Sequence, residues 1–102
     1  MNQSNLNYWK LNAPSLLYYH YAFIDTEKYF ADQLFIKNKV NVSFGKEYKR
    51  ENSPYIIIFC KIKKKDEKNF LTALSELKNK MILLGYIDYE KVCKELMKSF
   101  VK

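Results

Sequence analysis

Residues 55 to 63, Tyr-Ile-Ile-Ile-Phe-Cys-Lys-Ile-Lys, are the stretch of the chain that decides its fold. The run is apolar, rich in β-branched and aromatic residues and short for a helix, so it predicts a buried strand. Lys63 ends the stretch, Lys64 and Lys65 follow it, and Asp66 stands where it can cap a helix. The stretch therefore predicts a strand that leaves the core at a basic junction.

The neighbouring segments predict a hairpin and a helix around this strand. Residues 39 to 44 alternate apolar and polar side chains, which is typical of a strand with one wet face. Residues 45 to 54 are polar and charged and predict a long loop or a frayed hairpin end. From Phe70 to Leu84, apolar residues recur at steps of three and four, which predicts a helix that ends at Gly85.

The first half of the chain predicts one more strand and one more helix. Residues 15 to 24 are rich in aromatic side chains and predict a strand that is apolar on both faces. The length of this run also allows a helix that begins after Pro14. Asp25 or Thr26 can cap the next helix, which ends near Asn38.

The complete order predicts the fold class. Residues 1 to 14 are expected to form an irregular arm, and residues 15 to 102 a single α+β domain, because no linker or repeat divides them. The order β-α-β-β-α-α predicts a two-layer sandwich of ferredoxin-like order with a three-stranded sheet that contains antiparallel pairing. An extra C-terminal helix, capped by Asp88, would stand where a fourth strand would lie.

Composition restricts the class of protein. Of 102 residues, 48% are hydrophobic and 17% aromatic, which suffices for one core and excludes a disordered chain. The first residues are polar, without the apolar stretch of a signal peptide. No apolar run approaches the ~20 residues that span a bilayer. We therefore expect a cytoplasmic protein without a membrane partner.

The net charge of +7 is concentrated in the middle of the chain. Residues 37 to 68 carry ten basic and four acidic side chains, a net of +6, whereas residues 1 to 36 carry a net of −1. If the two hairpin strands pair antiparallel, these basic side chains form two clusters. The expected cluster at the open end comprises Lys37, Lys39, Lys61, Lys63, Lys64 and Lys65, and the cluster at the loop end comprises Lys46, Lys49 and Arg50.

Alternation along residues 55 to 63 assigns the two faces of the sheet. The even-numbered positions are expected to face the helices, which leaves Tyr55, Ile57 and Phe59 on the other face. If that face is open, its rings can stack bases while the lysines at its edge hold phosphates. Alternatively, the last helix or a second copy of the chain covers it.

No set of catalytic or metal-binding residues is evident. The one histidine, His20, lies in an aromatic run and fits a hydrogen-bonded sheet residue better than a general base. Cys60 and Cys93 are far apart in the sequence and are expected to be buried, reduced thiols. A structural zinc site would need about four clustered ligands. We therefore expect no enzyme, no catalytic residue, no metal and no cofactor.

These observations predict a small basic binding module that contacts an anionic partner, either nucleic acid or a nucleoprotein complex. Contact through lysine would be non-specific and salt-dependent. A short chain of this kind would suit an accessory or inhibitor protein of a phage or mobile element. The alternative is a homodimeric protein-protein interaction module, because nine Tyr and seven Phe are more than one small core readily hides. Its interface would be the aromatic sheet face or the C-terminal helix.

Overall fold

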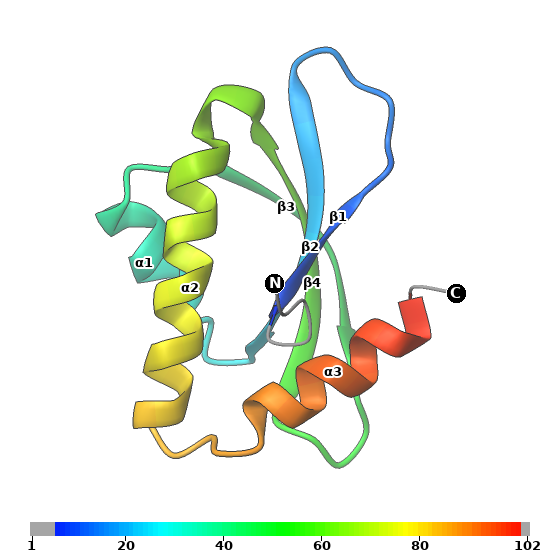
Figure 1. Cartoon of the computed structure of the whole chain (residues 1–102), viewed down its shortest axis with the longest axis vertical. Coiled ribbons are helices and arrows are strands. Elements are labelled where there is room, and N and C mark those ends of the chain that lie inside the picture. Colours follow the sequence, from blue (N-terminus) through cyan, green and yellow to red (C-terminus); the bar gives the residue numbers. More distant parts are fainter. Residues whose placement is uncertain (1–5, 101–102) are drawn as a thin grey trace.

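The computed structural model describes residues 6–100, which form one sheet and three α-helices (Figure 1). In chain order the elements are β1 (Tyr8–Leu11), β2 (Tyr18–Thr26), α1 (Ala31–Lys37), β3 (Val42–Lys49), β4 (Tyr55–Lys63), a 3-10 turn (Lys64–Asp66), α2 (Glu67–Leu83) and α3 (Tyr89–Phe100). The α+β class predicted from the sequence is confirmed.

The sheet has the strand order β1-β2-β4-β3, and each neighbouring pair is antiparallel. β4, formed by the stretch that decides the fold, lies between β2 and β3. Val42 pairs with Ile62, which confirms the predicted antiparallel hairpin. β3 continues past a register shift between Phe44 and Glu47, so the hairpin loop begins only after Lys49. The prediction of loop for this segment rests on its polar and charged composition, which does not show that it pairs with β4 beyond an irregularity of the strand.

The sheet has four strands, and the prediction of three is corrected. The additional strand β1 pairs with β2 at the edge of the sheet, with Trp9 opposite Ala22. The irregular arm expected over residues 1–14 therefore contains a strand at Tyr8–Leu11, while residues 1–5 lie outside the described residues. Four residues are too few for an alternating pattern to be recognised. From β2 to α2, the order of elements matches the ferredoxin-like prediction.

Helices lie on both faces of the sheet, whereas two layers were predicted. α1 and α2 pack on the face that carries Tyr21 and Phe23, whose rings contact Phe70 of α2. α3 crosses the other face at the end where β4 begins, and the ring centroids of Tyr55 and Tyr89 lie 5.8 Å apart. β4 begins with apolar side chains on both faces, and both must be removed from water. Thus α3 covers the second face of the sheet, and β1, not α3, lies at the edge beside β2.

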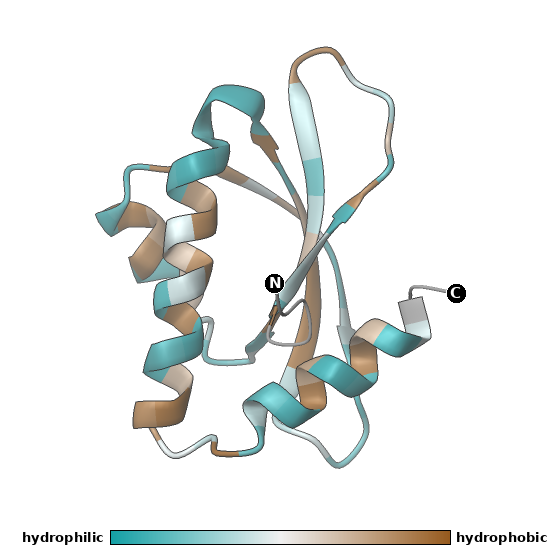
Figure 2. Cartoon of the chain, viewed as in Figure 1, coloured by the Kyte–Doolittle hydropathy of each residue, from teal (hydrophilic) through white to brown (hydrophobic). Residues whose placement is uncertain are grey.

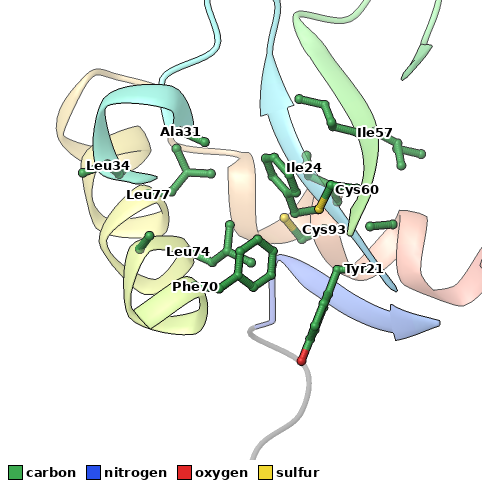
Figure 3. Packing of buried hydrophobic residues seen from close by; sticks show 14 of the residues in the cluster. Tyr21, Ile24, Ala31, Leu34, Ile57, Cys60, Phe70, Leu74, Leu77 and Cys93 are labelled. Atoms are coloured by element: carbon green, nitrogen blue, oxygen red, sulfur yellow. The ribbon is translucent and has the colours of Figure 1, made fainter. Parts of the chain in front are cut away.

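Phe70 lies at the centre of the core between α2 and the sheet (Figure 3). Its side chain is fully buried, and its ring centroid lies 4.8 Å from that of Tyr21 and 5.4 Å from that of Phe35 in α1. Leu74 and Leu77 continue the same buried stripe along α2. The helix predicted from the spacing of these residues is confirmed, and its apolar stripe is what holds α2 against the sheet.

Some of the residues that were expected to begin or end the helices do so, and others do not. The buried Asp25 carboxylate accepts hydrogen bonds from the N–H groups of Thr26 (2.7 Å) and Ala31 (3.0 Å), which ties β2 to the first residue of α1. α1 therefore begins several residues later than expected. Gly85 has a φ of +102°, as expected for a glycine that ends a helix. Asp66 precedes α2, but its side chain makes no capping hydrogen bond, contrary to the prediction.

Asn7 and Tyr89 join the edge of the sheet to α2 and α3. The Nδ2 group of Asn7 donates to the carbonyl oxygen of Leu74 (3.0 Å) and to the hydroxyl oxygen of Tyr89 (2.9 Å). The hydroxyl of Tyr89 donates in turn to the carbonyl oxygen of Ile24 (2.5 Å). These groups are buried and paired, so they add to the apolar contacts that hold α3 on the sheet.

Candidate functional site

The start of β2 and the residues that end and follow β4 meet at one end of the sheet. Tyr18 lies opposite Lys63. The N–H group of Lys64 donates to the carbonyl oxygen of Leu17 (3.1 Å), which fixes the lysines relative to the β1–β2 loop. We call this group the basic end of the sheet, and it comprises Leu16, Leu17, Tyr18, Lys61, Lys63, Lys64 and Lys65.

The four lysines of the basic end are accessible and form no ion pair within residues 6–100. Lys63, Lys64 and Lys65 are exposed, and Lys61 is half-buried. The Nζ atom of Lys61 lies 4.6 Å from the ring centroid of Tyr18, and that of Lys64 lies 5.2 Å from the ring centroid of Tyr19.

Two acids follow the lysines. Asp66 is half-buried and is in no ion pair within residues 6–100, and Glu67 is held by other groups. Glu67 begins α2, and its Oε2 atom accepts hydrogen bonds from Lys10 (2.8 Å) and from the Tyr21 hydroxyl. These two donors hold the pKa of Glu67 below its ordinary value, so the group stays ionised. Because this carboxylate is paired with Lys10 and hydrogen-bonded to Tyr21, Glu67 does not neutralise the lysines beside it.

Two exposed leucines make part of the basic end apolar. Leu16 is 92% exposed and Leu17 is 68% exposed at the tip of the β1–β2 loop, which extends beyond the body of the molecule (Figures 1 and 2). A hollow of about 350 Å³ lies between this tip and the lysines. It is lined by Leu16, Leu17, Tyr18, Lys63, Lys64 and Lys65. The site thus combines apolar surface with cationic groups.

A second hollow of about 280 Å³ lies beside the first, on the part of the sheet face that α3 leaves open. Its lining includes Leu11, His20, Phe59 and Lys61. The Nδ1 atom of His20 is buried there without a hydrogen-bond partner among the described residues. The hollow therefore offers a ring and an ammonium group to a ligand.

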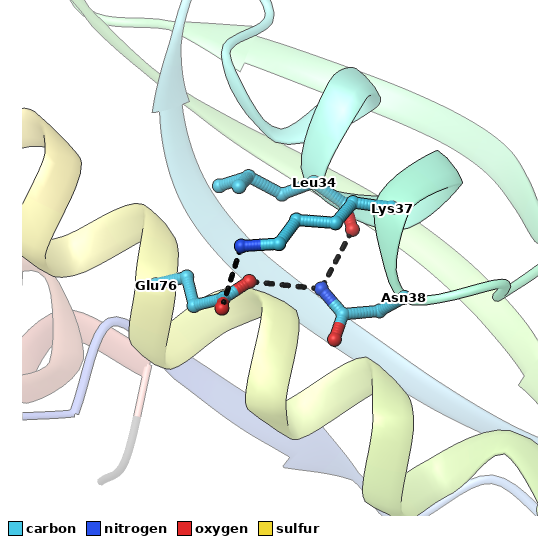
Figure 4. Close-up of polar contacts among 4 residues, drawn as sticks. All are labelled: Leu34, Lys37, Asn38 and Glu76. Atoms are coloured by element: carbon cyan, nitrogen blue, oxygen red, sulfur yellow. Dashed lines mark hydrogen bonds and ion pairs between the residues drawn. The ribbon is translucent and has the colours of Figure 1, made fainter.

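Lys37 and Lys39 do not line either hollow. Lys37 lies in the last turn of α1, and its Nζ atom is 3.1 Å from the Oε2 atom of Glu76 in α2 (Figure 4). Asn38 donates to the other oxygen of the same carboxylate (2.9 Å). Lys39 follows in the turn before β3 and is exposed. Of the predicted open-end cluster, Lys63, Lys64 and Lys65 line one hollow and Lys61 lines the other.

The predicted loop-end cluster is mixed with acids. Lys46 and Lys49 lie on β3, Arg50 follows it, and all three are exposed. The Nζ atom of Lys49 is 3.0 Å from the Oε2 atom of Glu27. Glu47, which is also exposed, lies between the two lysines in the sequence. This end of the hairpin therefore presents a weaker positive field than the basic end.

Two of the three predicted stacking residues are covered. Tyr55 and Ile57 are buried, and Tyr55 makes ring contacts with Tyr86 and Tyr89 on the side of α3. Of the two arrangements that the sequence left open, cover by the last helix is the observed one over Tyr55 and Ile57. Phe59 is half-buried and lines the second hollow.

The two thiols are poorly suited to chemistry. Cys60 and Cys93 are free and buried, and burial raises the pKa of each to about 12. Both remain protonated near neutral pH, whereas a nucleophilic cysteine needs the thiolate. Within residues 6–100, no group of three or more His, Cys, Asp or Glu side chains could hold a metal ion.

Sequence reasoning missed Leu16 and Leu17, because it assigned them to a strand buried on both faces. The strand begins only at Tyr18, whose N–H group donates to the Ser15 hydroxyl oxygen (3.1 Å). Pro14 and Ser15 were the available signal, since a proline followed by a small polar residue is typical of a turn. The two leucines thus belong to the loop.

Comparisons of the chain with protein families, curated proteins and solved structures found no match. In residues 6–100, each helix is too short or too polar to pass through a bilayer. The site is therefore interpreted from its own chemistry.

Proposed function

We propose that this protein is a small, non-enzymatic, cytoplasmic module that binds nucleic acid, free or in a nucleoprotein complex, through the basic end of the sheet. The observation that carries the proposal is the set of four lysines beside Tyr18, none of which forms an ion pair with the acids that the structure describes. Ammonium groups neutralise phosphates, and an adjacent ring gives a surface on which a base can stack. An accessory or inhibitor protein of a phage or mobile element fits this description.

The basic side chains at the site are of a kind that favours contact with the phosphate backbone. All four cations are lysines, which act as point charges, whereas sequence readout in the major groove relies mainly on the forked donor group of arginine. Arg50 lies at the other end of the hairpin. We therefore expect binding to depend weakly on base sequence and strongly on salt.

A salt titration tests this function. If four lysines each neutralise one phosphate, the logarithm of the association constant for duplex DNA falls against the logarithm of salt concentration with a slope of about −3.6. Replacing Lys63, Lys64 and Lys65 by glutamine should reduce this slope to about −0.9, because one contact remains. Fluorescence anisotropy of labelled DNA over a salt series measures both values.

The matched control removes the same charge elsewhere. Lys91, Lys94 and Lys98 are exposed on α3, and their replacement by glutamine lowers the net charge equally. This variant should keep a slope near that of the unchanged protein. An equal loss of DNA affinity in the two triple variants would show that net charge alone attracts DNA. An association constant that does not change with salt concentration would refute the proposal.

A second candidate function, homodimerisation, is favoured by an apolar surface away from the basic end. Leu83 is 86% exposed and Ile87 is 84% exposed, and Leu84 between them is also exposed. Figure 2 shows this apolar group at the end of α2 and in the turn toward α3. Exposed apolar clusters of this kind mark interaction surfaces.

Light scattering over a range of concentrations tests the dimer. We expect the mass to approach that of two chains at high micromolar concentration, and Leu83→Lys to keep the chain monomeric because it places a charge in the interface. Lys80→Ala on the same helix serves as a control that should still dimerise. A monomer at every concentration would remove this candidate.

A further inference from the structure

The two hollows at the basic end lie on either side of one cation-ring pair. Lys61 lines the hollow that contains Phe59, and Tyr18 lines the hollow that contains the exposed leucines. The Nζ atom of Lys61 lies 4.6 Å from the centroid of the Tyr18 ring, so the two hollows adjoin. Tyr18 and His20 point to the same face of β2, two positions apart. The arrangement is a short row of apolar recesses with lysines along it.

Each recess has room for a flat ring. The volumes, about 350 and about 280 Å³, lie near the lower limit of ~300–1,000 Å³ that is usual for small-ligand sites. Leucine and aromatic side chains line both recesses, and Lys63, Lys64 and Lys65 also line the larger one. A ligand that fits must present an apolar ring and an anionic group next to each other.

In an intact duplex the bases are stacked on one another and only the phosphates reach a protein surface of this kind. A single strand instead has splayed bases that can enter recesses while its phosphates contact lysines. We infer that the basic end selects single-stranded nucleic acid, with bases in the two hollows and phosphates on Lys61, Lys63, Lys64 and Lys65. This inference rests on the proposed function and specifies its substrate class.

The test compares a single-stranded oligonucleotide with the duplex of the same sequence and length. We expect the single strand to bind at least about tenfold more tightly at the same salt concentration, because each stacked base contributes ~1–3 kcal/mol. Tyr18→Ala should lower affinity for the single strand about tenfold and leave duplex affinity almost unchanged. Leu16→Ser combined with Leu17→Ser should lower single-strand affinity severalfold without disturbing the fold, since both side chains are exposed.

The matched control is Ile36→Ser, which removes an exposed apolar side chain of α1 that lines neither hollow. This variant should bind both nucleic acids as the unchanged protein does. Equal affinity for single strand and duplex, with a normal salt slope, would overturn the inference and leave the proposed function in place. Absence of binding to both would overturn the two together.

Two further outcomes would show that the basic end binds a different ligand, or binds nucleic acid in a different way. If the Leu16/Leu17 variant loses duplex affinity as much as single-strand affinity, the leucines act as a wedge between base pairs, and the inference fails. If anionic phospholipid vesicles compete fully with the single strand and the same variant no longer binds them, the apolar tip enters lipid, and the inference also fails. Sedimentation of the protein with vesicles measures the second outcome.

Discussion

Phe70→Ala is expected to lower the free energy of unfolding by about 3–5 kcal/mol, the usual range for removal of a buried phenylalanine ring. Phe70 is fully buried and its ring touches Tyr21 from β2 and Phe35 from α1, so its loss opens a cavity between both helices and the sheet. Such a change is a large fraction of the stability of a small domain. Urea unfolding followed by circular dichroism measures it.

Leu83→Ala on the same helix is the control for this experiment. Leu83 is exposed, so the same kind of truncation should change stability by no more than about 0.5 kcal/mol. A Phe70→Ala variant that unfolds at nearly the urea concentration of the unchanged protein would contradict the described core. A reduced urea dependence instead of a shifted midpoint would indicate a less compact folded state.

The contribution of Asp25 to stability is expected to fall by about 3 kcal/mol as the pH rises from about 4 to about 6. Burial raises the pKa of Asp25 from 3.8 to about 6, although the N–H groups of Ala31 and Thr26 donate to the carboxylate and act in the opposite direction. Over this interval the unfolded chain releases the proton first, so ionisation favours the unfolded state. Below about pH 4 both states are protonated and the penalty vanishes.

Asp25→Asn isolates this effect, because asparagine has nearly the same size and does not titrate. The difference in unfolding free energy between the unchanged protein and the variant should fall with rising pH over this interval and stay flat above it. Chemical unfolding at a series of pH values gives the difference directly, and the other titrating groups cancel in it. A difference that rises with pH would show that the hydrogen bonds to the carboxylate outweigh its burial.

Sequence reasoning recovered the elements whose pattern is long and regular. β4 agrees with its predicted bounds because its nine residues form one continuous run that is mostly β-branched and aromatic. α2 agrees because its apolar stripe spans several turns. The antiparallel hairpin followed from alternation on both strands. The missed strand β1 has four residues and is stabilised by pairing with β2, a contact that no local pattern records.

The site was recovered in part for a related reason. Lys61 and Lys63–Lys65 follow from position, because consecutive residues at the end of one strand must lie together. The placement of Lys37 depends on the ion pair with Glu76, which is 39 positions away and belongs to another helix. Likewise, alternation found the side chains on the second face, but only the path of α3 decides that Tyr55 is buried and Phe59 still partly open.

The link between Asn7 and Tyr89 spans 82 positions, so it has a consequence for the order of events during synthesis. Its hydrogen bonds cannot form until the ribosome has added residue 89, after the residues of β2 and β4 have been joined to the chain. Until then, the sheet face that bears Tyr55 and Ile57 has no helix over it, and such a face tends to associate with other nascent chains. Lys61 and Lys63, which flank that face, are suited to keep neighbouring chains apart by charge during this interval.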